Sequence, residues 1–173
     1  MGNGFLLTIG ALLLLSLFTL TANGLISENE RIAEENEYFV TSLSIAQSII
    51  DEAKAKAFDQ GTVSTPLDSL IVLTLPINLG PETGEFVPVP DSLGTGGYMS
   101  TSFFNDVDDY NGYVRVVDTP RAEGYAATVR VEYGSPTWPD SILTTSSFCK
   151  RMTVSVTNPH VSQAVTLQYA FIY

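Results

Sequence analysis

The sequence predicts an α+β fold in which a long N-terminal α-helix packs on a C-terminal antiparallel β-sheet. Three observations predict this fold. Residues 2–27 contain no charged side chain, residues 39–57 carry apolar side chains at helical spacing, and four segments after residue 112 alternate apolar and polar side chains. The length of 173 residues favours one domain, with little room for a second.

The first expected element is an apolar helix within residues 1–26. Residues 5–20 read FLLTIGALLLLSLFTL, and no charge follows before Glu28. A helix of about 20 apolar residues spans a bilayer, so this segment is long enough to cross a membrane. A cleaved secretory signal, a permanent anchor and an anchor that later leaves the bilayer all remain open. The secretory signal is disfavoured, because it needs a basic n-region and no Lys or Arg precedes Arg31.

The second expected element continues the helix over residues 27–60. Residues 27–58 contain neither Gly nor Pro. Asn23-Gly24 is the expected site of any kink, because Gly costs about 1 kcal/mol inside a helix, and Gly61 is expected to end the helix as its C′ residue. Apolar side chains recur at steps of four and three along one face, which we expect to pack on the sheet: Phe39, Leu43, Ala46, Ile50 and Ala53.

The third expected element is a β-rich head over residues 61–173. Residues 69–75 form a short apolar run, and residues 113–118, 126–133, 151–157 and 165–173 show period-two alternation. Such alternation is typical of antiparallel strands that bury one face against a helix. Residues 76–103, rich in Gly and Pro, and residues 134–147 are expected to form loops, and a long irregular loop usually marks an exposed or functional surface.

The composition argues against several functions. The net charge of −11 argues against a nucleic-acid partner, because phosphate binding needs a basic face. One Cys and one His allow neither an intrachain disulfide nor a zinc site with four Cys and His ligands. His160 follows an Asn-Pro turn signal and is expected to be solvated, whereas Cys149 is expected to be a small apolar residue beside a strand. No nucleophile–base constellation is recognisable, so we expect no catalytic residue and no enzyme.

One turn concentrates acidic side chains: Asp106, Asp108 and Asp109, followed by Asn111. Oxygen ligands at this density suit Ca²⁺, which takes about six to eight oxygens. Asx-turn chemistry ahead of the next strand accounts for the same residues without a metal. The turn is favoured, because Val117 stands where a calcium loop carries its last Glu. Calcium is the one cofactor left open.

A Gly-Phe junction, an apolar N-terminal helix, an amphipathic continuation and a small C-terminal sheet together resemble a type IV pilin or a type II secretion pseudopilin. Gly4-Phe5 resembles the processing junction of such precursors, and residues 104–113 (FNDVDDYNGY) resemble a segment of minor pilins and pseudopilins. The resemblance implies insertion in the inner membrane, followed by helical homopolymerisation through a pilus assembly machinery. The implied assembly residues are Phe5, Leu6, Leu7, Ile9, Gly10, Leu12, Leu13, Leu14, Leu15, Leu17, Phe18 and Leu20.

The sequence departs from the usual pattern of that family. Pilins usually carry a Glu at mature position five, where this sequence has Ile9 if Phe5 is the first mature residue and Phe5 if Met1 is the first. The usual Pro near mature position 22 is absent, and the single Cys149 cannot form the C-terminal disulfide common among pilins. The resemblance is therefore to an atypical member that needs another driving force for subunit docking.

Taken together, these observations predict a structural subunit of a type IV pilus-like extracellular filament at the cell surface. One alternative is a minor pseudopilin or tip subunit of a secretion or pilus machine, which the missing Glu favours by resemblance. Another is a membrane-anchored extracytoplasmic binding domain linked to calcium. The sequence does not distinguish adhesion, motility, uptake and secretion as the role of a filament.

Overall fold

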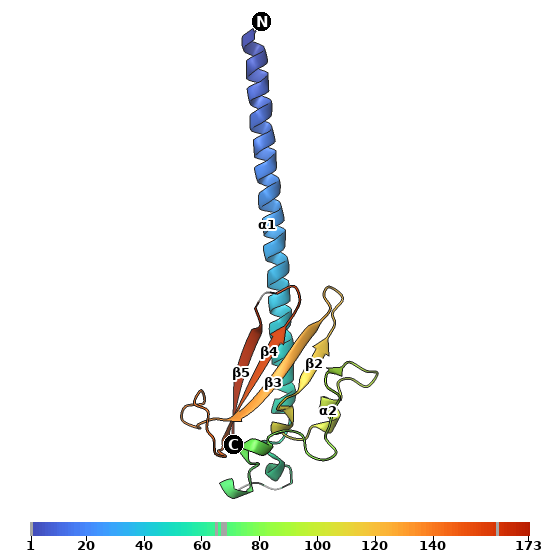
Figure 1. Ribbon diagram of the computed structural model, residues 1–173, viewed down its shortest axis with the longest axis vertical. Coiled ribbons are helices and arrows are strands. Elements are labelled where there is room, and N and C mark those ends of the chain that lie inside the picture. Colours follow the sequence, from blue (N-terminus) through green and yellow to red (C-terminus); the bar gives the residue numbers. More distant parts are fainter. Residues whose placement is uncertain (1, 65, 67–68, 162) are drawn as a thin grey trace. The chain divides into compact units, whose positions relative to one another are not determined.

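The computed structural model describes residues 2–64, 66, 69–161 and 163–173 of the chain (Figure 1). It confirms the α+β class, with the long apolar helix α1 (Gly2–Lys54) followed by a five-stranded sheet. Two compact units divide the chain, residues 1–37 and residues 38–173. We refer to the second unit as the head.

In the first unit, α1 runs through Asn23 and Gly24 without interruption. Asn23-Gly24, where the sequence allowed a kink, does not break the helix, because one Gly costs a helix only about 1 kcal/mol. Arg31 forms ion pairs with Glu28 and Glu35, one turn away on either side along the exposed surface of the helix. Such i,i+3 and i,i+4 pairs support a helix that no other element covers.

In the head, α1 ends at Lys54 and not near Phe58 as expected. The reason is tertiary, because Ala57 leaves the helix to bond another segment. The Ala57 N–H donates to the Asn105 carbonyl at 3.0 Å, and the Ala57 carbonyl accepts from the Val107 N–H at 3.0 Å. Gly61 is not the C′ residue of α1, since it lies in a short 3-10 helix (Gln60–Thr62) that Asp59 caps.

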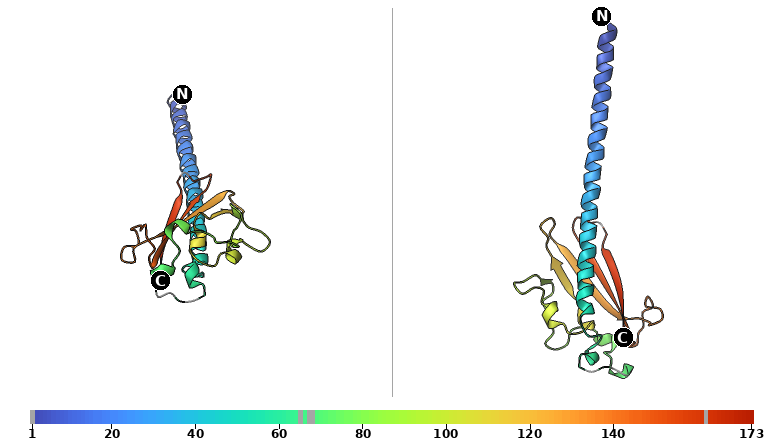
Figure 2. Two further views of the ribbon diagram at one scale, coloured as in Figure 1. Left: turned by 60° about the horizontal axis from the view of Figure 1, so that its bottom comes forward. Right: turned by 180° about the vertical axis from the view of Figure 1, so that it is seen from behind.

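The head portion of α1 crosses one face of the sheet, as the view from behind shows (Figure 2). Of the predicted stripe, Ala46, Ile50 and Ala53 are buried, whereas Phe39 and Leu43 are 49% and 38% exposed. The buried face is centred slightly to one side of the predicted stripe and comprises Ser42, Ile45, Ala46, Ile49, Ile50 and Ala53.

The strands follow one another in space in chain order, β1-β2-β3-β4-β5. Their bounds are β1 (Asp91–Ser92), β2 (Val114–Val117), β3 (Tyr125–Tyr133), β4 (Cys149–Thr157) and β5 (Val165–Ile172). From β2 to β5 all pairs are antiparallel, as expected, but β1 pairs with β2 in parallel. The sheet is therefore mixed. The two residues of β1 come from the long loop and are too few to show any alternation in the sequence.

The apolar run at residues 69–75 does not form a strand where it is described. Leu70–Val72 form a 3-10 helix, and among the side chains of this run whose burial is described, Leu73 is the buried hydrophobic one. Short apolar runs do not distinguish strand from helix by period alone. Here a backbone N–H group bonds to a side chain and not to a neighbouring strand. The Thr74 N–H donates to both carboxylate oxygens of Asp59 at 3.1–3.2 Å.

The core lies between α1 and the inner face of the sheet. Phe104, Tyr110 and Tyr113 pack edge to face within it, with ring centroids 4.9–5.8 Å apart. At its rim, Arg115 of β2 donates to Glu52 of α1 at 2.6 Å, and both side chains are largely buried. This buried pair fixes the last turn of α1 against the sheet. The short helix α2 (Ser100–Phe103) adds to the same corner.

Candidate functional site

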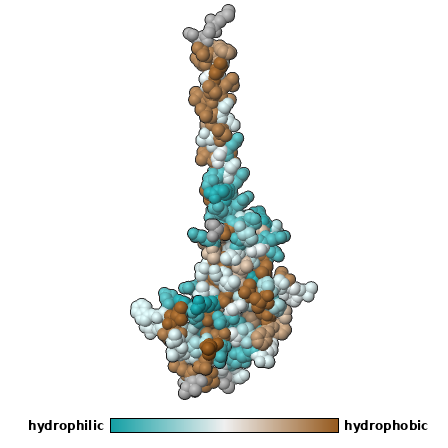
Figure 3. All heavy atoms as spheres, viewed as in Figure 1, coloured by the Kyte–Doolittle hydropathy of each residue, from teal (hydrophilic) through white to brown (hydrophobic). Residues whose placement is uncertain are grey.

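The first candidate functional region is the apolar part of α1 in the unit of residues 1–37. All large apolar side chains of the predicted assembly set are exposed, from 40% for Ile9 to 75% for Leu7. The helix is long and apolar enough to cross a membrane. Figure 3 shows the visible face of this segment as mostly hydrophobic and the part of the helix that follows it as hydrophilic.

The few polar side chains of this segment are satisfied within the helix. The hydroxyls of Ser16, Thr19 and Thr21 donate to carbonyls one turn earlier at 2.8–2.9 Å, and Thr8 donates to the Phe5 carbonyl at 2.8 Å. No polar group of these side chains therefore needs water, which is what an apolar environment requires. A side chain at Gly10 would meet no other atom within 4 Å, so this position leaves room for close approach by another helix.

The predicted processing junction lies near the start of this helix. Gly4 and Phe5 are both helical and exposed. Cleavage between them stays a prediction.

The second candidate region is the acidic turn of the head. Asp106, Asp108 and Asp109 are fully buried around the 3-10 helix Asp108–Tyr110. Asp106 Oδ1 accepts from the Asp108 and Asp109 N–H groups at 2.8 and 3.3 Å, and Asp109 Oδ2 accepts from the Asn105 and Asp106 N–H groups at 2.8 and 3.1 Å. The Asx-turn interpretation therefore describes one oxygen of each of these two carboxylates.

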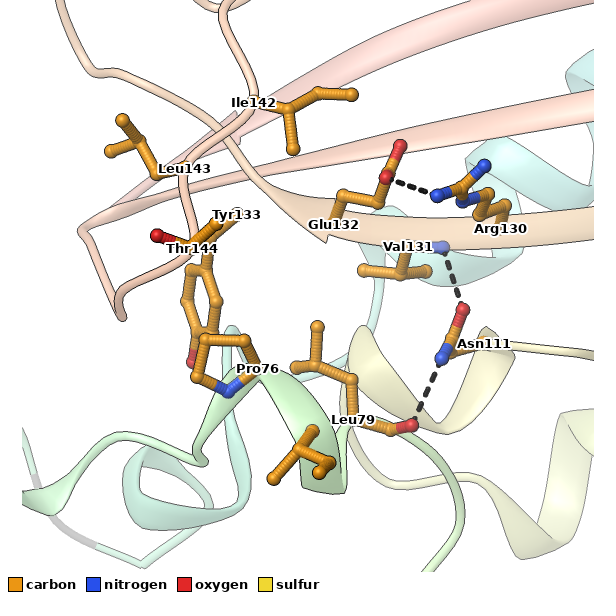
Figure 4. A pocket seen from close by; sticks show the side chains of 11 residues that line it. Pro76, Leu79, Asn111, Arg130, Val131, Glu132, Tyr133, Ile142, Leu143 and Thr144 are labelled. Carbon is orange, nitrogen blue, oxygen red and sulfur yellow. Dashed lines mark hydrogen bonds and ion pairs between the residues drawn. The ribbon is translucent and has the colours of Figure 1, made fainter.

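Asn111 does not join the acidic turn. Its amide nitrogen donates to the Leu79 carbonyl at 2.9 Å, and its amide oxygen accepts from the Val131 N–H at 3.1 Å. Figure 4 shows both bonds. The side chain thus joins the long loop to β3, and each of its two polar atoms has a backbone partner.

A fully buried lysine lies beside the acidic turn. Lys150 Nζ donates to Asp59 Oδ2 at 2.7 Å, to the Phe58 carbonyl at 2.8 Å, and to Asp108. Lys150 was not among the residues predicted from the sequence, although the alternation of the strand indicates that it is buried. Lys150 has the same parity along β4 as Met152, and alternation carries both to the buried face.

Two glutamates of the long loop complete the acidic cluster. One carboxylate oxygen from each of Glu82, Asp106 and Asp108 lies within 4.8 Å of the others, and the same holds for Glu82, Glu85 and Asp109. Glu85 also accepts from the Asn105 side-chain amide. Glu82 and Glu85 stand about 20 residues before the turn and carried no sequence signal that linked them to it.

The surroundings of this cluster disfavour the charged form of its carboxylates. Burial and the neighbouring Glu85 raise the pKa of Glu82 to about 8. Burial, then the hydrogen bond and charge of Asp108, raise the pKa of Asp106 to about 9. Burial also raises the pKa of Asp109 to about 6, against the backbone N–H bonds that lower it. Each of these groups therefore favours a proton or another cation more than an exposed carboxylate does.

A surface pocket of about 400 Å³ lies at the end of β3, next to the loop that contains Pro76 and Leu79 (Figure 4). Its lining is mixed, with Val131, Tyr133 and Ile142 beside the ion pair of Arg130 and Glu132. The Tyr133 hydroxyl is already engaged, since it donates to the Thr74 carbonyl at 2.6 Å. The pocket shows no grouping of nucleophile and base among the side chains that line it.

The single Cys and the single His lie in the environments that the sequence favours. Cys149 is fully buried at the start of β4, and burial raises the pKa of its thiol. His160 lies exposed in a turn and stacks on Tyr38 with ring centroids 5.2 Å apart.

Comparisons with protein-family models, with curated proteins and with solved structures found no match to this chain. The fold itself defines an α+β protein with an N-terminal helix long and apolar enough to cross a membrane and a head that buries its own core.

Proposed function

We propose that the chain is a structural subunit of a type IV pilus-like filament, which polymerises through the apolar part of α1. The observation that carries the proposal is the exposed, uncharged surface of residues 5–20, joined by one uninterrupted helix to a head that buries its own core. The α+β fold, with a long apolar helix followed by a sheet, is consistent with that of a pilin.

The apolar segment needs a partner other than water. Its large side chains, such as Leu12, Leu14 and Phe18, are 63%, 69% and 72% exposed. Covering a large apolar side chain contributes about 1.5–3 kcal/mol relative to water, so the segment belongs in lipid or among other apolar helices. Before assembly the inner membrane supplies that environment, and in a filament the helices of other subunits supply it.

An open polymer follows from the geometry of such contacts. A patch that binds a different patch on the next copy, without closing a ring, produces a helical filament. Because the segment has no acidic residue, we infer that apolar packing drives docking here and that the position of Gly10 sets how closely helices approach. Transfer from lipid to the filament core gains little hydrophobic free energy, so a pilus assembly machinery is the expected partner.

The missing acidic residue also favours a second candidate, a minor or tip subunit of a secretion or pilus machine. A subunit at the tip has a neighbour on one side only. Where pilin-like subunits pair an acidic side chain with a neighbour's amino terminus, an end subunit can lack it, and this sequence has Ile9 or Phe5 there. The two candidates differ in abundance, since a tip subunit is rare in sheared filaments and a major subunit predominates.

The test is electron microscopy and mass spectrometry of material sheared from cells that express the chain. The proposal expects filaments that contain this chain with its apolar helix intact. Leu13→Lys should abolish incorporation, because Lys at the centre of a membrane helix costs about 2.5–3.5 kcal/mol. The matched control is Leu93→Lys in the head, where the side chain is 70% exposed against 61% for Leu13.

Chain that is found only as a monomer in detergent extracts of membranes would overturn the filament proposal and leave a membrane-anchored extracytoplasmic domain. Equal incorporation of the Leu13 and Leu93 variants would also contradict it, since polymerisation would then not depend on the apolar segment.

A further inference from the structure

We propose that the acidic cluster of the head binds one divalent cation of the calcium type. The ligands are side-chain oxygens from two segments that lie far apart in the sequence: Glu82 and Glu85 of the long loop, and Asn105, Asp106, Asp108 and Asp109 of the turn. The inference does not depend on polymerisation, because all six residues belong to the head.

The first observation is the geometry of the acidic groups. Two overlapping sets share Glu82, and within each set the ligand oxygens lie within 4.8 Å of one another. Calcium binds oxygens at about 2.3–2.6 Å, so two ligands on opposite sides of one ion are about 4.6–5.2 Å apart. Each set of three oxygens is therefore compact enough to share one ion, and Glu82 belongs to both sets.

The second observation is independent of the acidity and concerns hydrogen bonding. Three fully buried carboxylates each leave one oxygen without any hydrogen-bond partner, namely Asp106 Oδ2, Asp108 Oδ2 and Asp109 Oδ1. Glu82 Oε2 and the amide oxygen of Asn105 are unpartnered in the same way. A buried polar atom without a partner costs about 1–3 kcal/mol, and five such acceptors in one cluster are suited to bind a positively charged ligand.

The carboxylates of the turn divide their two oxygens between two tasks. In Asp106 and Asp109, one oxygen accepts backbone N–H groups and holds the turn. In Asp108, one oxygen accepts from Lys150. The second oxygen of each is left over. A turn that needed these residues only for its own hydrogen bonds has no use for the second oxygens.

The charge balance supports the same inference. Five carboxylates meet in the cluster, and Lys150 pairs with one of them, Asp108. Lys150 is shared with Asp59, which lies outside the cluster. Nearby Lys56 donates instead to the Thr101 and Phe104 carbonyls, both at 2.8 Å. A divalent ion supplies the compensation that one shared ammonium does not.

The ligand chemistry selects the type of ion. All six ligands offer oxygen, whereas zinc prefers nitrogen and sulfur donors. Magnesium keeps several waters and near-octahedral geometry and is usually bound by only one or two carboxylates. Six side chains at irregular spacing suit calcium, with its larger and more flexible shell. The ion would join the loop of Glu82 to the turn of Asp106, and through Lys150 to the start of β4.

The experiment measures thermal unfolding of the full-length chain in detergent micelles after treatment with a chelator. Millimolar Ca²⁺ should raise the melting temperature of the head, and the rise should increase with Ca²⁺ concentration. Tb³⁺, a calcium substitute, should bind with tyrosine-sensitised luminescence that Ca²⁺ displaces. The variants Glu82→Gln and Asp106→Asn should weaken Ca²⁺ binding by about tenfold or more.

The matched controls are Glu123→Gln and Asp140→Asn, which change the same residue types at exposed positions of the head. Both should bind Ca²⁺ like the wild type. The proposal is overturned if Ca²⁺ leaves the melting temperature unchanged. It is also overturned if the cluster variants, folded by circular dichroism, bind as tightly as the controls, or if Mg²⁺ stabilises the head more than Ca²⁺ does.

Discussion

Large apolar side chains are exposed in the first 37 residues and form a buried core in the head, although one helix runs through both. Leu12, Leu13 and Leu14 are 61–69% exposed, whereas Ile49 and Ile50 further along α1 are 0–1% exposed. Helical hydrogen bonding is continuous in both regions, so the difference is one of partners. The head supplies its own partner in the sheet. The first unit has an apolar surface of the kind that lipid or another apolar helix would cover.

The ion pairs of the two regions also differ in burial. In the first unit, Arg31 pairs with glutamates on the surface, and more than half of each side chain is exposed. In the head, Lys150 and its partners Asp59 and Asp108 are fully buried. Exposed pairs are screened by water and contribute little, whereas a buried pair is costly to break. Substitutions of charged residues should therefore change stability much more in the head than in the first unit.

The largest effect is expected from Lys150→Met. It leaves the buried carboxylates of Asp59 and Asp108 without their ammonium, and breaking a buried pair by removal of one partner costs about 3–5 kcal/mol. The matched variant Lys54→Met removes a lysine whose side chain is 36% exposed and should unfold near the wild type. Denaturant unfolding in micelles, followed by near-ultraviolet circular dichroism, measures both. Equal stability of the two variants would contradict the buried cluster.

A slightly smaller effect is expected from Ile50→Ala. This residue is 1% exposed in the core, and truncation of a buried Ile costs about 2–5 kcal/mol. Ile9→Ala makes the same change in the first unit, at a side chain that is 40% exposed, and should leave unfolding of the head unchanged. The same unfolding assay compares them. A loss of head stability in the Ile9 variant would show that the two units fold as one.

The acid response should also come from the head. Burial raises the pKa of Asp59, but the ammonium of Lys150 and the N–H donors of Gly61 and Thr74 outweigh it and hold the pKa below its ordinary value of 3.8. A lowered folded-state pKa contributes stability above pH 3.8 that is lost as the pH falls through the folded-state pKa. The Tyr133 hydroxyl also faces this carboxylate, at 3.1 Å.

Urea unfolding at a series of pH values below neutrality tests this prediction. Asp59→Asn should lose less stability on acidification than the wild type does. In the first unit, the hydrogen bond and charge of Arg31 lower the pKa of the fully exposed Glu28. Because water screens that pair, Glu28→Gln should leave the acid response unchanged. An Asp59 variant with the wild-type slope would refute the assignment.

The smallest effect is expected from Arg31→Ala. It removes both surface ion pairs of the first unit, with Glu28 and Glu35. Because these side chains are solvated, the head should melt at the wild-type temperature, with helicity changed only slightly. Far- and near-ultraviolet circular dichroism check the two quantities separately. A large fall in helicity would show that these pairs hold the exposed part of α1 together.

Local periodicity predicted most of the fold. Alternation located β2 to β5 with ends within two residues of those observed, and in β3 and β4 every second side chain is buried. Helical spacing predicted that α1 continues to the sheet. What periodicity could not predict were β1, which has two residues, and the 3-10 helix at Leu70–Val72, where contacts to Asp59 decide the backbone.

The candidate cation site was only partly predictable for a related reason. Asp106, Asp108 and Asp109 are adjacent in the sequence, so their clustering was visible. Glu82 reaches them through a loop whose path depends on tertiary contacts, and Lys150 reaches them from a strand some 40 residues later. Asn111 was a reasonable candidate by spacing, but its amide is used to join the loop to β3. Sequence spacing does not show which hydrogen bonds a side chain makes in the fold.

Cys149 and Lys150 are neighbours at the start of β4, and each has a side chain that a chemical reagent can modify. Their rates of modification therefore report local unfolding of this end of the strand. The chain contains one thiol and three lysines, and both Cys149 and Lys150 are fully buried. A thiol reagent should therefore leave the folded chain unmodified, and an amine reagent should reach Lys54 long before Lys150. Modification of both neighbours at the same rate would report a single local opening event at the start of β4, and separate rates would report two.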